Sequence, residues 1–373
     1  MKLILPLFLC FLNIFNSCNR QVNNLSEIQI DRFGKLNLGD TVLDLGKSIW
    51  IVFQASNGNY WFGSDTSGVY KYDGKTIINY KTDDGLCSNR IRGIQEDKHG
   101  NIYFSTLEGI SKFNGLHFTT LTAIRSQYPN DGWELNPDDL WFSLLGKNGE
   151  KGPYRYDGIF LYQLEFPKHY LADAYFKRFP NNSWSPYEVY YIYKDRKGIM
   201  WFGTSNFGIC RYDGNALSWL YEDHLTNVPN GGSFGIRSII EDVKGAYWFC
   251  NTRYRYKISA DTIHENGYLF IKYQKDIGIK GLKSEDGTKS IYFMSAVEDK
   301  GSNLWLATYN EGVFKYNGKD VMHYAIKEGA KEIKVFSIYC DRSGDLWLGT
   351  HEAGAFKFNG TAFEKFRPGA NVR

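Results

Sequence analysis

Alternation of apolar and polar side chains with a period of two is clearest in residues 195–214, DRKGIMWFGTSNFGICRYDG. Residues 199–204 place Trp201 and Gly203 on one face, as a β-strand does. An Asp-x-x-Gly turn precedes this strand, and a second strand at residues 208–212 ends at an Asp-Gly pair, which is a two-residue hairpin signal. The stretch therefore predicts a β-meander.

The same pattern recurs along most of the chain. Its second half is Gly, two strand residues, Lys or Arg, an aromatic residue, Asp or Asn, and Gly. This half occurs at residues 68–74, 109–115, 152–158, 208–214, 312–318 and 354–360. Its first half recurs, intact or eroded, around aromatic strand positions 38 to 60 residues apart: Trp61, Tyr103, Trp141, Trp201, Trp248, Trp305 and Trp347. Repeats of this length are typical of propeller blades. We expect an all-β fold, a seven-bladed β-propeller of four-stranded antiparallel blades over residues 48–373, in which the fifth copy has YRYKIS in place of the second half.

These repeats resemble the two-component-regulator propeller repeat, which builds the extracellular sensor propellers of hybrid sensor kinases in gut and marine Bacteroidetes. The resemblance runs from about Ile49 to Phe366. It implies a propeller with a sensor-like role, but it indicates no particular activity, because function depends on a site and not on a fold. The Asp-box of sialidases is a different motif, with Ser or Thr before Asp and one residue between Asp and Gly.

The N-terminus has the features of a lipoprotein signal peptide. After Met1-Lys2, residues 3–15 form an apolar run too short for a convincing membrane-spanning helix. The run leads into FNSC, in which a small residue precedes Cys18 as in a lipobox. We expect residues 1–17 to be a signal peptide, Cys18 to be lipidated, and residues 18–47 to form a linker with an extra strand.

Two residues leave the cellular location of the protein open. Phe15 and Asn16 depart from the usual lipobox, so simple secretion is the alternative and a cytoplasmic location a distant third. Asn19 is not the Asp that retains lipoproteins at the inner membrane, so resemblance to other lipoproteins favours the outer membrane. We expect a cell-envelope protein, either an outer-membrane lipoprotein held by its lipid alone or a periplasmic or secreted protein.

Composition and charge exclude several classes of partner and cofactor. The chain is 17% aromatic with 38 Gly against 9 Pro, which suits many short strands and tight turns. The formal net charge is only +3 and there is no basic run, so we expect no nucleic-acid partner. The cysteines after Cys18 have no Cys-x-x-Cys spacing, and we expect neither a metal site, nor another cofactor, nor a disulfide framework. We expect a monomer.

Long insertions mark one face of the predicted propeller. They occupy residues 122–137, 163–186, 221–234 and 274–289, each after the outermost strand of one blade and before the innermost strand of the next. These connections emerge on the same face as the loops between second and third strands. Loops on a rigid scaffold commonly carry binding sites, so we expect the site on this face.

The candidate site residues are those that break the repeat on this face. Arginines at a channel mouth suit a carboxylate group, and aromatic residues suit a sugar ring or a protein partner. We therefore predict a site for an anionic glycan or an acidic protein loop, formed by Arg90, Arg237, Arg253, Tyr309, His351, Trp133, Trp184 and Tyr187. The alternatives are that the arginines pair with Glu108, Glu311 and Glu352 in a structural rim and that the aromatic residues only anchor their loops.

No catalytic motif is present in the sequence. The paired carboxylates Glu96-Asp97, Glu241-Asp242 and Glu298-Asp299 recur at one repeat position, so we interpret them as turn residues. We expect a lipid-anchored binding or protein-interaction module. No output domain follows the repeats in this sequence, so sensing would pass to a partner. The alternative is a metal-dependent lyase or other carbohydrate-active enzyme, since streptogramin lyases use a channel-end His and Glu, and His351 adjoins Glu352.

Overall fold

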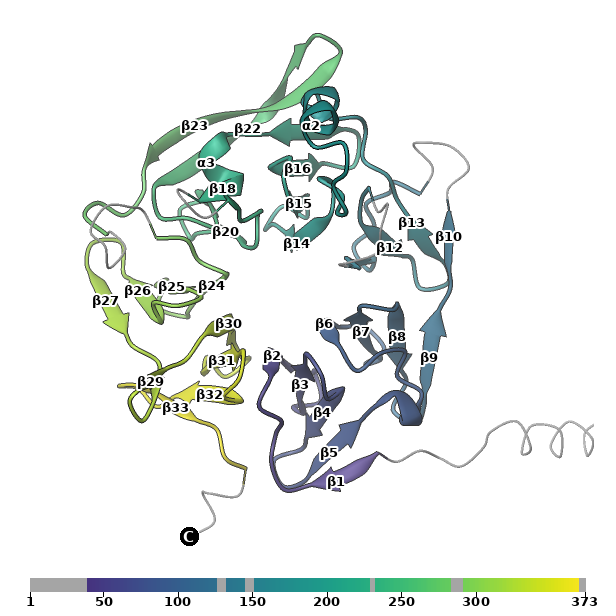
Figure 1. Cartoon of the computed structure of the whole chain (residues 1–373), viewed down its shortest axis with the longest axis vertical. Helices are drawn as coiled ribbons and strands as arrows, with labels where there is room; N and C mark the ends of the chain where they lie inside the picture. The colour runs from purple at the N-terminus through teal and green to yellow at the C-terminus, as the bar shows by residue number, and fades with distance from the viewer. Residues whose placement is uncertain (1–38, 126–131, 145–150, 229–231, 283–290, 369–373) are drawn as a thin grey trace, which may run out of the picture. The chain divides into compact units, whose positions relative to one another are not determined.

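The computed structural model describes residues 39–125, 132–144, 151–228, 232–282 and 291–368. Their strands form seven mainly antiparallel units, named blades 1 to 7, that stand side by side around a ring (Figure 1). The predicted all-β propeller is therefore confirmed. The predicted signal peptide and Cys18 lie outside the described residues. Within them, no helix is both long enough and apolar enough to cross a bilayer.

Four blades follow the predicted plan without joining a neighbour, with the first strand nearest the channel (Figure 1). Blade 1 comprises β2 (Ile49–Gln54), β3 (Tyr60–Ser64), β4 (Val69–Tyr72) and β5 (Ile77–Tyr80), with β1 (Asp40–Val42) antiparallel to β5 at its outer edge. Blade 2 comprises β6 (Ile91–Glu96), β7 (Ile102–Thr106), β8 (Ile110–Phe113) and β9 (Phe118–Leu121). Blade 6 comprises β24 (Ser295–Glu298), β25 (Leu304–Ala307), β26 (Val313–Tyr316) and β27 (Val321–Tyr324). Blade 7 comprises β30 (Val335–Cys340), β31 (Leu346–Thr350), β32 (Ala355–Phe358) and β33 (Phe363–Lys365).

Blades 4 and 5 are joined into one eight-stranded sheet. Blade 4 comprises β14 (Val189–Lys194), β15 (Met200–Thr204), β16 (Ile209–Tyr212) and β17 (Leu217–Leu220), and blade 5 comprises β20 (Ile239–Glu241), β21 (Tyr247–Phe249), β22 (Tyr254–Glu265) and β23 (Tyr268–Ile277). The fifth repeat has no Asp-Gly turn after YRY, so β22 continues to the turn at Asn266 and Gly267, both with positive φ. The long hairpin reaches the outer edge of blade 4, where Phe270 pairs with Trp219.

Blade 3 differs from the prediction because no innermost strand is present among its described residues. β11 (Leu140–Phe142), the equivalent of a second strand, pairs with β12 (Tyr154–Tyr156), which pairs with β13 (Leu161–Gln163). The fourth strand, β10 (Ala123–Arg125), lies parallel to β13 on the outer side. In the described residues 132–139, Trp133 and Leu135 pack against the core between blades 3 and 4.

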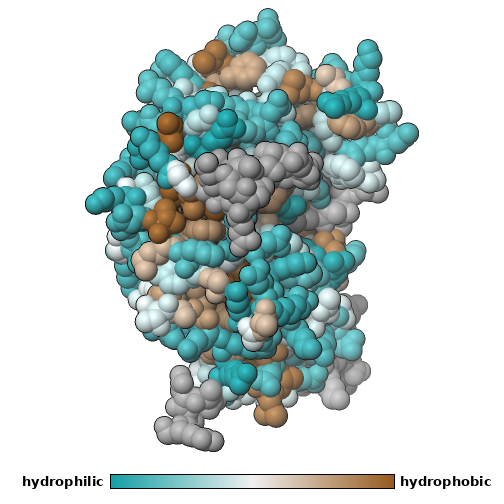
Figure 2. Space-filling model, turned by 60° about the vertical axis from the view of Figure 1, so that its left-hand side comes forward, coloured by the Kyte–Doolittle hydropathy of each residue, from teal (hydrophilic) through white to brown (hydrophobic). Residues whose placement is uncertain are grey.

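Short elements occupy the connections between blades. They are the 3-10 helix η1 (Thr82–Asp84), the helices α2 (Ala172–Arg178) and α3 (Asp223–Thr226), and the two-stranded pairs β18 (Asn227–Val228) with β19 (Gly232–Ser233) and β28 (Lys327–Glu328) with β29 (Lys331–Glu332). The side of the ring shown in Figure 2 is mostly hydrophilic, and its hydrophobic residues form small separate patches.

The repeated aromatic position forms the core of every blade. The seven side chains are between 0 and 4% exposed: Trp61, Tyr103, Trp141, Trp201, Trp248, Trp305 and Trp347. Four of the indole nitrogens donate to the Asp of the same repeat, as Trp201 does to Asp195 at 2.8 Å. The first repeat has no Asp at this turn, and there the indole nitrogen of Trp61 has no hydrogen-bond partner among the described residues.

The ring closes between blades 1 and 7 without exchanging strands. The hydroxyl of Tyr60 donates to Asp341 at 2.7 Å, as the Tyr247 hydroxyl donates to Asp195 between blades 5 and 4. Phe366, after the last strand, stacks on Phe62 of blade 1 with ring centroids 5.8 Å apart. Blades 7 and 1 therefore share the Tyr–Asp hydrogen bond seen between blades 4 and 5, which are joined in addition by the pairing of β17 with β23.

Candidate functional site

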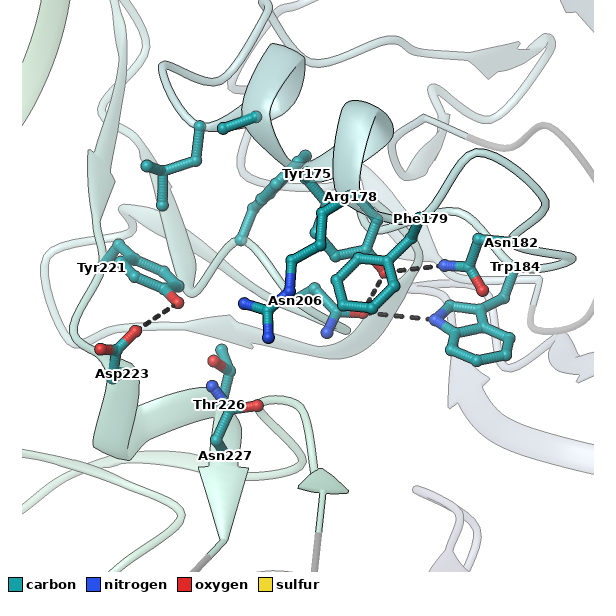
Figure 3. Close-up of a pocket in the computed structure, with 13 residues that line it drawn as sticks. Tyr175, Arg178, Phe179, Asn182, Trp184, Asn206, Tyr221, Asp223, Thr226 and Asn227 are labelled. Carbon is teal, nitrogen blue, oxygen red and sulfur yellow. Dashed lines mark hydrogen bonds between the residues drawn. The ribbon is translucent and has the colours of Figure 1, made fainter.

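A cavity of about 580 Å³ opens above blade 4, on the face that carries the insertions. This volume is within the range of small-molecule sites. Its walls come from α2 and the segment after it, the β15–β16 loop, Tyr221 and α3 (Figure 3). They combine five aromatic rings, three amides, one cation and one carboxylate: Tyr175, Phe179, Trp184, Phe207, Tyr221, Asn182, Asn206, Asn227, Arg178 and Asp223.

The insertion that carries α2 is anchored by its apolar residues. Phe166 and Tyr187 belong to the buried core of blade 4, and Ala172 faces the same core from α2. Asp173 lies in the first turn of α2, and Lys177 and Arg178 lie in the last, which favours the helix dipole. The C-terminal end of α2 therefore places Arg178 at the cavity, above these packed core residues.

His169 packs against the same core and has no access to solvent. Its ring stacks on Phe207 with centroids 4.5 Å apart, and its Nδ1 accepts the backbone N–H of Leu171 at 3.2 Å. Its own backbone N–H donates to the hydroxyl of Tyr187 at 2.8 Å. Burial lowers the pKa of His169 to about 3. The imidazole is therefore neutral and structural at physiological pH.

Amide hydrogen bonds orient the aromatic wall of the cavity (Figure 3). The side-chain oxygen of Asn206 accepts the indole N–H of Trp184 at 3.3 Å and the hydroxyl of Tyr175 at 3.4 Å. Asn182 donates to the same Tyr175 hydroxyl at 2.7 Å. Trp184 stays 52% exposed, so its ring is oriented by the protein and remains available to a ligand.

A cation and a carboxylate face the interior of the cavity from different elements. The guanidinium of Arg178 points toward the middle of the cavity in Figure 3, 5.2 Å from the ring of Phe179. No ion pair of Arg178 occurs among the described residues. Asp223 accepts the hydroxyl of Tyr221 at 2.8 Å, and burial together with this hydrogen bond raises the pKa of Tyr221 to about 12.

This arrangement suits a polar ring with an acidic substituent. Exposed aromatic faces stack on the apolar face of a sugar, and amide and carboxylate groups bind hydroxyl groups. A guanidinium binds a carboxylate through two parallel hydrogen bonds. The cavity therefore has groups for each part of an acidic sugar.

The structure places two of the predicted residues at this cavity, in different roles. Trp184 lines it, as expected for a binding residue. Tyr187 is only 5% exposed and packs on Phe207 beneath it, so Tyr187 supports the wall without facing the interior. The sequence also gave no reason to select Arg178, because it lies in an insertion that no repeat brings into register.

Three further candidates gather near the start of blade 1. Arg90 and Arg92 both donate to Asp65, at 3.2 and 2.6 Å. Arg92 lies over the ring of Trp50, and Trp50 lies 5.4 Å from the ring of His351, which lies 6.2 Å from Tyr309. Arg90, Tyr309 and His351 thus share a rim in which the arginines pair with a carboxylate, as in the structural alternative, though that carboxylate is Asp65.

The other two predicted arginines lie near blade 5. Arg237 donates to the carbonyl oxygen of Phe234 at 2.9 Å, and its guanidinium lies 4.5 Å from the ring of Tyr190. Arg253 lies over Tyr254, at 5.1 Å. Figure 1 shows blade 6, whose β25–β26 loop carries Tyr309, between blade 5 and blade 7. Arg237 and Arg253 therefore lie at a different part of the ring from Arg90 and His351.

Trp133 does not lie with any of these groups. Its ring packs against Trp141, Phe202 and Tyr212 in the core between blades 3 and 4. Its carbonyl oxygen accepts the Tyr212 hydroxyl at 2.7 Å, and its neighbour Leu135 lies beside the Asp213-Gly214 turn of the opposite face. Trp133 therefore packs partly buried against the core between blades 3 and 4.

The residues proposed for the lyase alternative face different neighbours. His351 packs near Trp50 and Tyr309, and Glu352 pairs with Lys331 at 2.8 Å. The described residues contain no group of three or more His, Cys, Asp or Glu arranged to hold a metal ion.

A second polar cluster, not predicted from the sequence, connects α3 to the long hairpin. Glu222 accepts the Tyr273 hydroxyl at 2.6 Å and the Lys275 ammonium at 2.7 Å, and lies 3.1 Å from His224. Burial opposes ionisation of Glu222, but these hydrogen bonds hold its pKa below its usual value. The cluster joins blades 4 and 5 beside the cavity. The sequence did not reveal this cluster, because Tyr273 and Lys275 lie 51 and 53 residues after Glu222.

Comparisons with known proteins agree with the repeat pattern. A profile of the two component regulator propeller matches residues 85–108, 183–206 and 331–352. No curated protein matches the sequence significantly. The fold is similar to the extracellular domain of BT4673, a one component system from B. thetaiotaomicron, with 19% identity and a TM-score of 0.53 over 85% of this chain and 39% of that one.

Two other solved structures show the same fold. The extracellular domain of BT3049, a hybrid two component system of B. thetaiotaomicron, has 16% identity and a TM-score of 0.51 over 87% of this chain and 40% of that one. Virginiamycin B lyase from Staphylococcus aureus has 14% identity and a TM-score of 0.56 over 85% of this chain and 97% of that one. This chain therefore spans about two fifths of the BT4673 and BT3049 domains. At these identities the likeness shows the fold alone.

Proposed function

We propose that this chain, whose repeats match the two component regulator propeller at three places, is a sensor-like binding module of the cell envelope that recognises an acidic sugar in the cavity above blade 4. The observation that carries the proposal is the position of Arg178, which faces a cavity of about 580 Å³ between aromatic walls. The ligand's carboxylate would meet this guanidinium, and its ring would stack on Trp184 or Phe179. Bound ligand would be reported to a protein partner.

The proposal is consistent with the way the cavity is built. Trp184 and Tyr175 are held by Asn206, so part of the entropic cost of ordering a binding site is already met in the folded protein. Asp223 stands near Tyr221, away from Trp184 in Figure 3, where it would accept hydroxyl groups and disfavour a second carboxylate. We therefore expect preference for a sugar with a single acidic group per bound residue.

Arg178→Gln tests this assignment. The variant keeps a polar side chain but removes the charge, so affinity for an oligogalacturonate probe should fall about tenfold, equivalent to about 1.4 kcal/mol. Binding is measured by calorimetry with the full chain, beside a glycan array to identify other acidic sugars. Lys177→Gln, on the same exposed helix end but outside the cavity lining, is the matched control and should bind as the parent does.

The ligand supplies a second control. Methyl-esterified oligogalacturonate has the same rings without the charge, and Arg178→Gln should bind both probes alike. Unchanged affinity of Arg178→Gln for the acidic probe, with a normal melting temperature, would exclude the cavity as the carboxylate site. Equal losses in Arg178→Gln and Lys177→Gln would show a general effect of surface charge.

The proposed location of the protein is the cell envelope, with Cys18 as a lipidated N-terminus. It is supported by the apolar run before FNSC and by the similarity to domains described as extracellular. Mass spectrometry of protein isolated from its native membrane should find a diacylated or triacylated Cys18 as the first residue. Cys18→Ser should move the protein from the membrane fraction to the soluble fraction, and an unmodified N-terminus at another residue would refute the anchor.

A further inference from the structure

The face opposite the insertions carries the turns between the third and fourth strands of the blades, and is named the turn face. In blade 2 this turn joins β8 to β9, and its Leu116 side chain is 63% exposed. In blade 3 the turn joins β12 to β13, and Ile159 and Phe160 are 77% and 51% exposed. Large apolar side chains therefore project into solvent at the outer tips of two neighbouring blades.

The adjoining tip of blade 1 has a further exposed apolar residue. β1 is antiparallel to β5, and its last residue, Val42, pairs with Ile77, the first residue of β5 after the turn. β1 therefore ends at the turn face, and Leu43, which follows it, is 89% exposed. The outer strands β5, β9 and β13 follow one another along the rim of the ring in Figure 1. The exposed residues at their tips, named the apolar arc, are Leu43, Leu116, Ile159 and Phe160.

Backbone hydrogen bonds close these turns without the help of a large apolar side chain. Oδ1 of Asp157 accepts the backbone N–H groups of Ile159 and Phe160, at 2.8 and 2.7 Å. The equivalent turns of blades 1, 4, 6 and 7 are closed in the same way around Lys75 and Thr76, Asn215 and Ala216, Lys319 and Asp320, and Thr361 and Ala362. Because the turn accepts small or polar residues, the apolar arc indicates a contact outside this chain.

Charged groups of both signs lie beside the apolar arc. Lys75 and Asp73 are exposed on the blade 1 turn, and the exposed Asp44 directly follows Leu43. In blade 2, Lys98 pairs with Asp138 at 2.7 Å. These charges do not form a field of one sign, so the contact made by the arc depends on burial of its apolar side chains.

We propose that the turn face rests on a lipid bilayer and that the apolar arc inserts among the lipid headgroups. A bilayer accepts separate apolar tips on one face, whereas a stable protein interface needs a continuous complementary surface. The inference rests on the proposed lipidation of Cys18. The chain from Cys18 to Gly39 spans at most about 75 Å when fully extended, so the lipid keeps the arc close to the membrane. The arc is then a second membrane contact in addition to the lipid.

Vesicle binding by the chain without its lipid tests the proposal. The mature chain from residue 18 onward, with Cys18→Ser, is floated with phosphatidylcholine vesicles, and its partition coefficient is measured. We expect partition that persists at about 0.5 M salt, because salt screens attraction between charges but not apolar insertion. Ile159→Asp combined with Phe160→Asp should lower the partition coefficient at least about tenfold. Leu116→Asp should lower it as well, because the arc includes blade 2.

Blade 7 provides the matched control for the double variant. The backbone N–H of Ala362 donates to Oδ1 of Asn359 at 2.9 Å, as that of Phe160 donates to Asp157. Thr361→Asp combined with Ala362→Asp therefore adds the same two charges at the same turn positions, outside the apolar arc. This control should partition as the parent does. Equal melting temperatures of the two double variants would show that their difference arises at the membrane.

Four outcomes would overturn the proposal. They are absence of partition at millimolar lipid, equal partition of the two double variants, loss of partition at high salt, and dimers in solution that Ile159→Asp with Phe160→Asp separates. The last result would assign the apolar arc to a second copy of this chain. Mass spectrometry of Cys18 tests the anchor separately, so an unmodified Cys18 is distinguishable from a failure of vesicle binding.

Discussion

The Asp of the repeated Asp-x-x-Gly turn connects that turn to the following strand and to the neighbouring blade. Oδ1 of Asp195 accepts the backbone N–H groups of Lys197 and Ile199, which forms the turn. Oδ2 accepts the indole of Trp201 and the hydroxyl of Tyr247 from blade 5. The sequence-based interpretation of this position as a turn residue is confirmed, and the structure adds that the same carboxylate joins two blades.

His169 makes stability depend on pH. Burial lowers its pKa to about 3, whereas the unfolded chain has a pKa near 6.5. Between these values the unfolded state binds the extra proton, so stability falls as the pH drops from about 6.5 toward 3. The loss from this group is at most about 1.4 kcal/mol per pH unit. Denaturant unfolding at pH 7 and pH 5 measures it.

A matched pair of variants isolates the histidine. His169→Phe retains stacking on Phe207 but cannot be protonated, so its free energy of unfolding should fall less between pH 7 and pH 5 than that of the parent. His99→Phe changes an exposed histidine of blade 2 and should retain the parental pH dependence. Identical pH dependence in all three proteins would show that His169 is accessible to protons in the folded state.

At the scale of elements, turn residues decide where strands end. Repeats with Asp-Gly or Asn-Gly after the third strand turn back after at most four strand residues, as β16 does. The fifth repeat lacks that pair, and β22 runs for 12 residues to the turn at Asn266 and Gly267. The sequence located this departure from the repeat. It did not show that the longer hairpin would pair with β17, because that contact joins residues about 50 positions apart.

The insertions have different roles although they share one sequence signature. Residues 163–186 form a helix and one wall of the cavity above blade 4. The described part of 122–137 instead packs Trp133 between blades. Aromatic residues outside a repeat pattern are compatible with both roles, since a ring stabilises a core and a ligand by the same apolar contact.

At the scale of the whole molecule, the closure between blades 7 and 1 depends on side-chain contacts, among them the same Tyr–Asp hydrogen bond that occurs between blades 4 and 5. Tyr60→Phe removes the hydrogen bond to Asp341, and Tyr247→Phe removes the matching bond to Asp195. Each bond involves a charged group, so each variant should lose about 1.5–3 kcal/mol of unfolding free energy in denaturant titrations.

The comparison of the two variants decides how the ring is held. Equal losses in one cooperative transition are expected, because the two tyrosines make the same hydrogen bond to the Asp of the preceding blade. A much smaller loss for Tyr60→Phe, or a separate early transition in that variant, would show that the ring opens at its closure before the blades unfold.

The repeat pattern alone determined the blade plan, the buried aromatic position and the face that carries the insertions. These features depend on neighbours within about ten residues, where strand period and turn residues act directly. Tertiary structure alone decided which of the candidate site residues lie close together. It placed Arg90 and His351 on other blades than Arg237 and Arg253, packed Trp133 and Tyr187 against the core, and brought Arg178 into a cavity with Trp184 and Asp223. These outcomes depend on how the insertions pack across blades, and that packing leaves no periodic signal in the sequence.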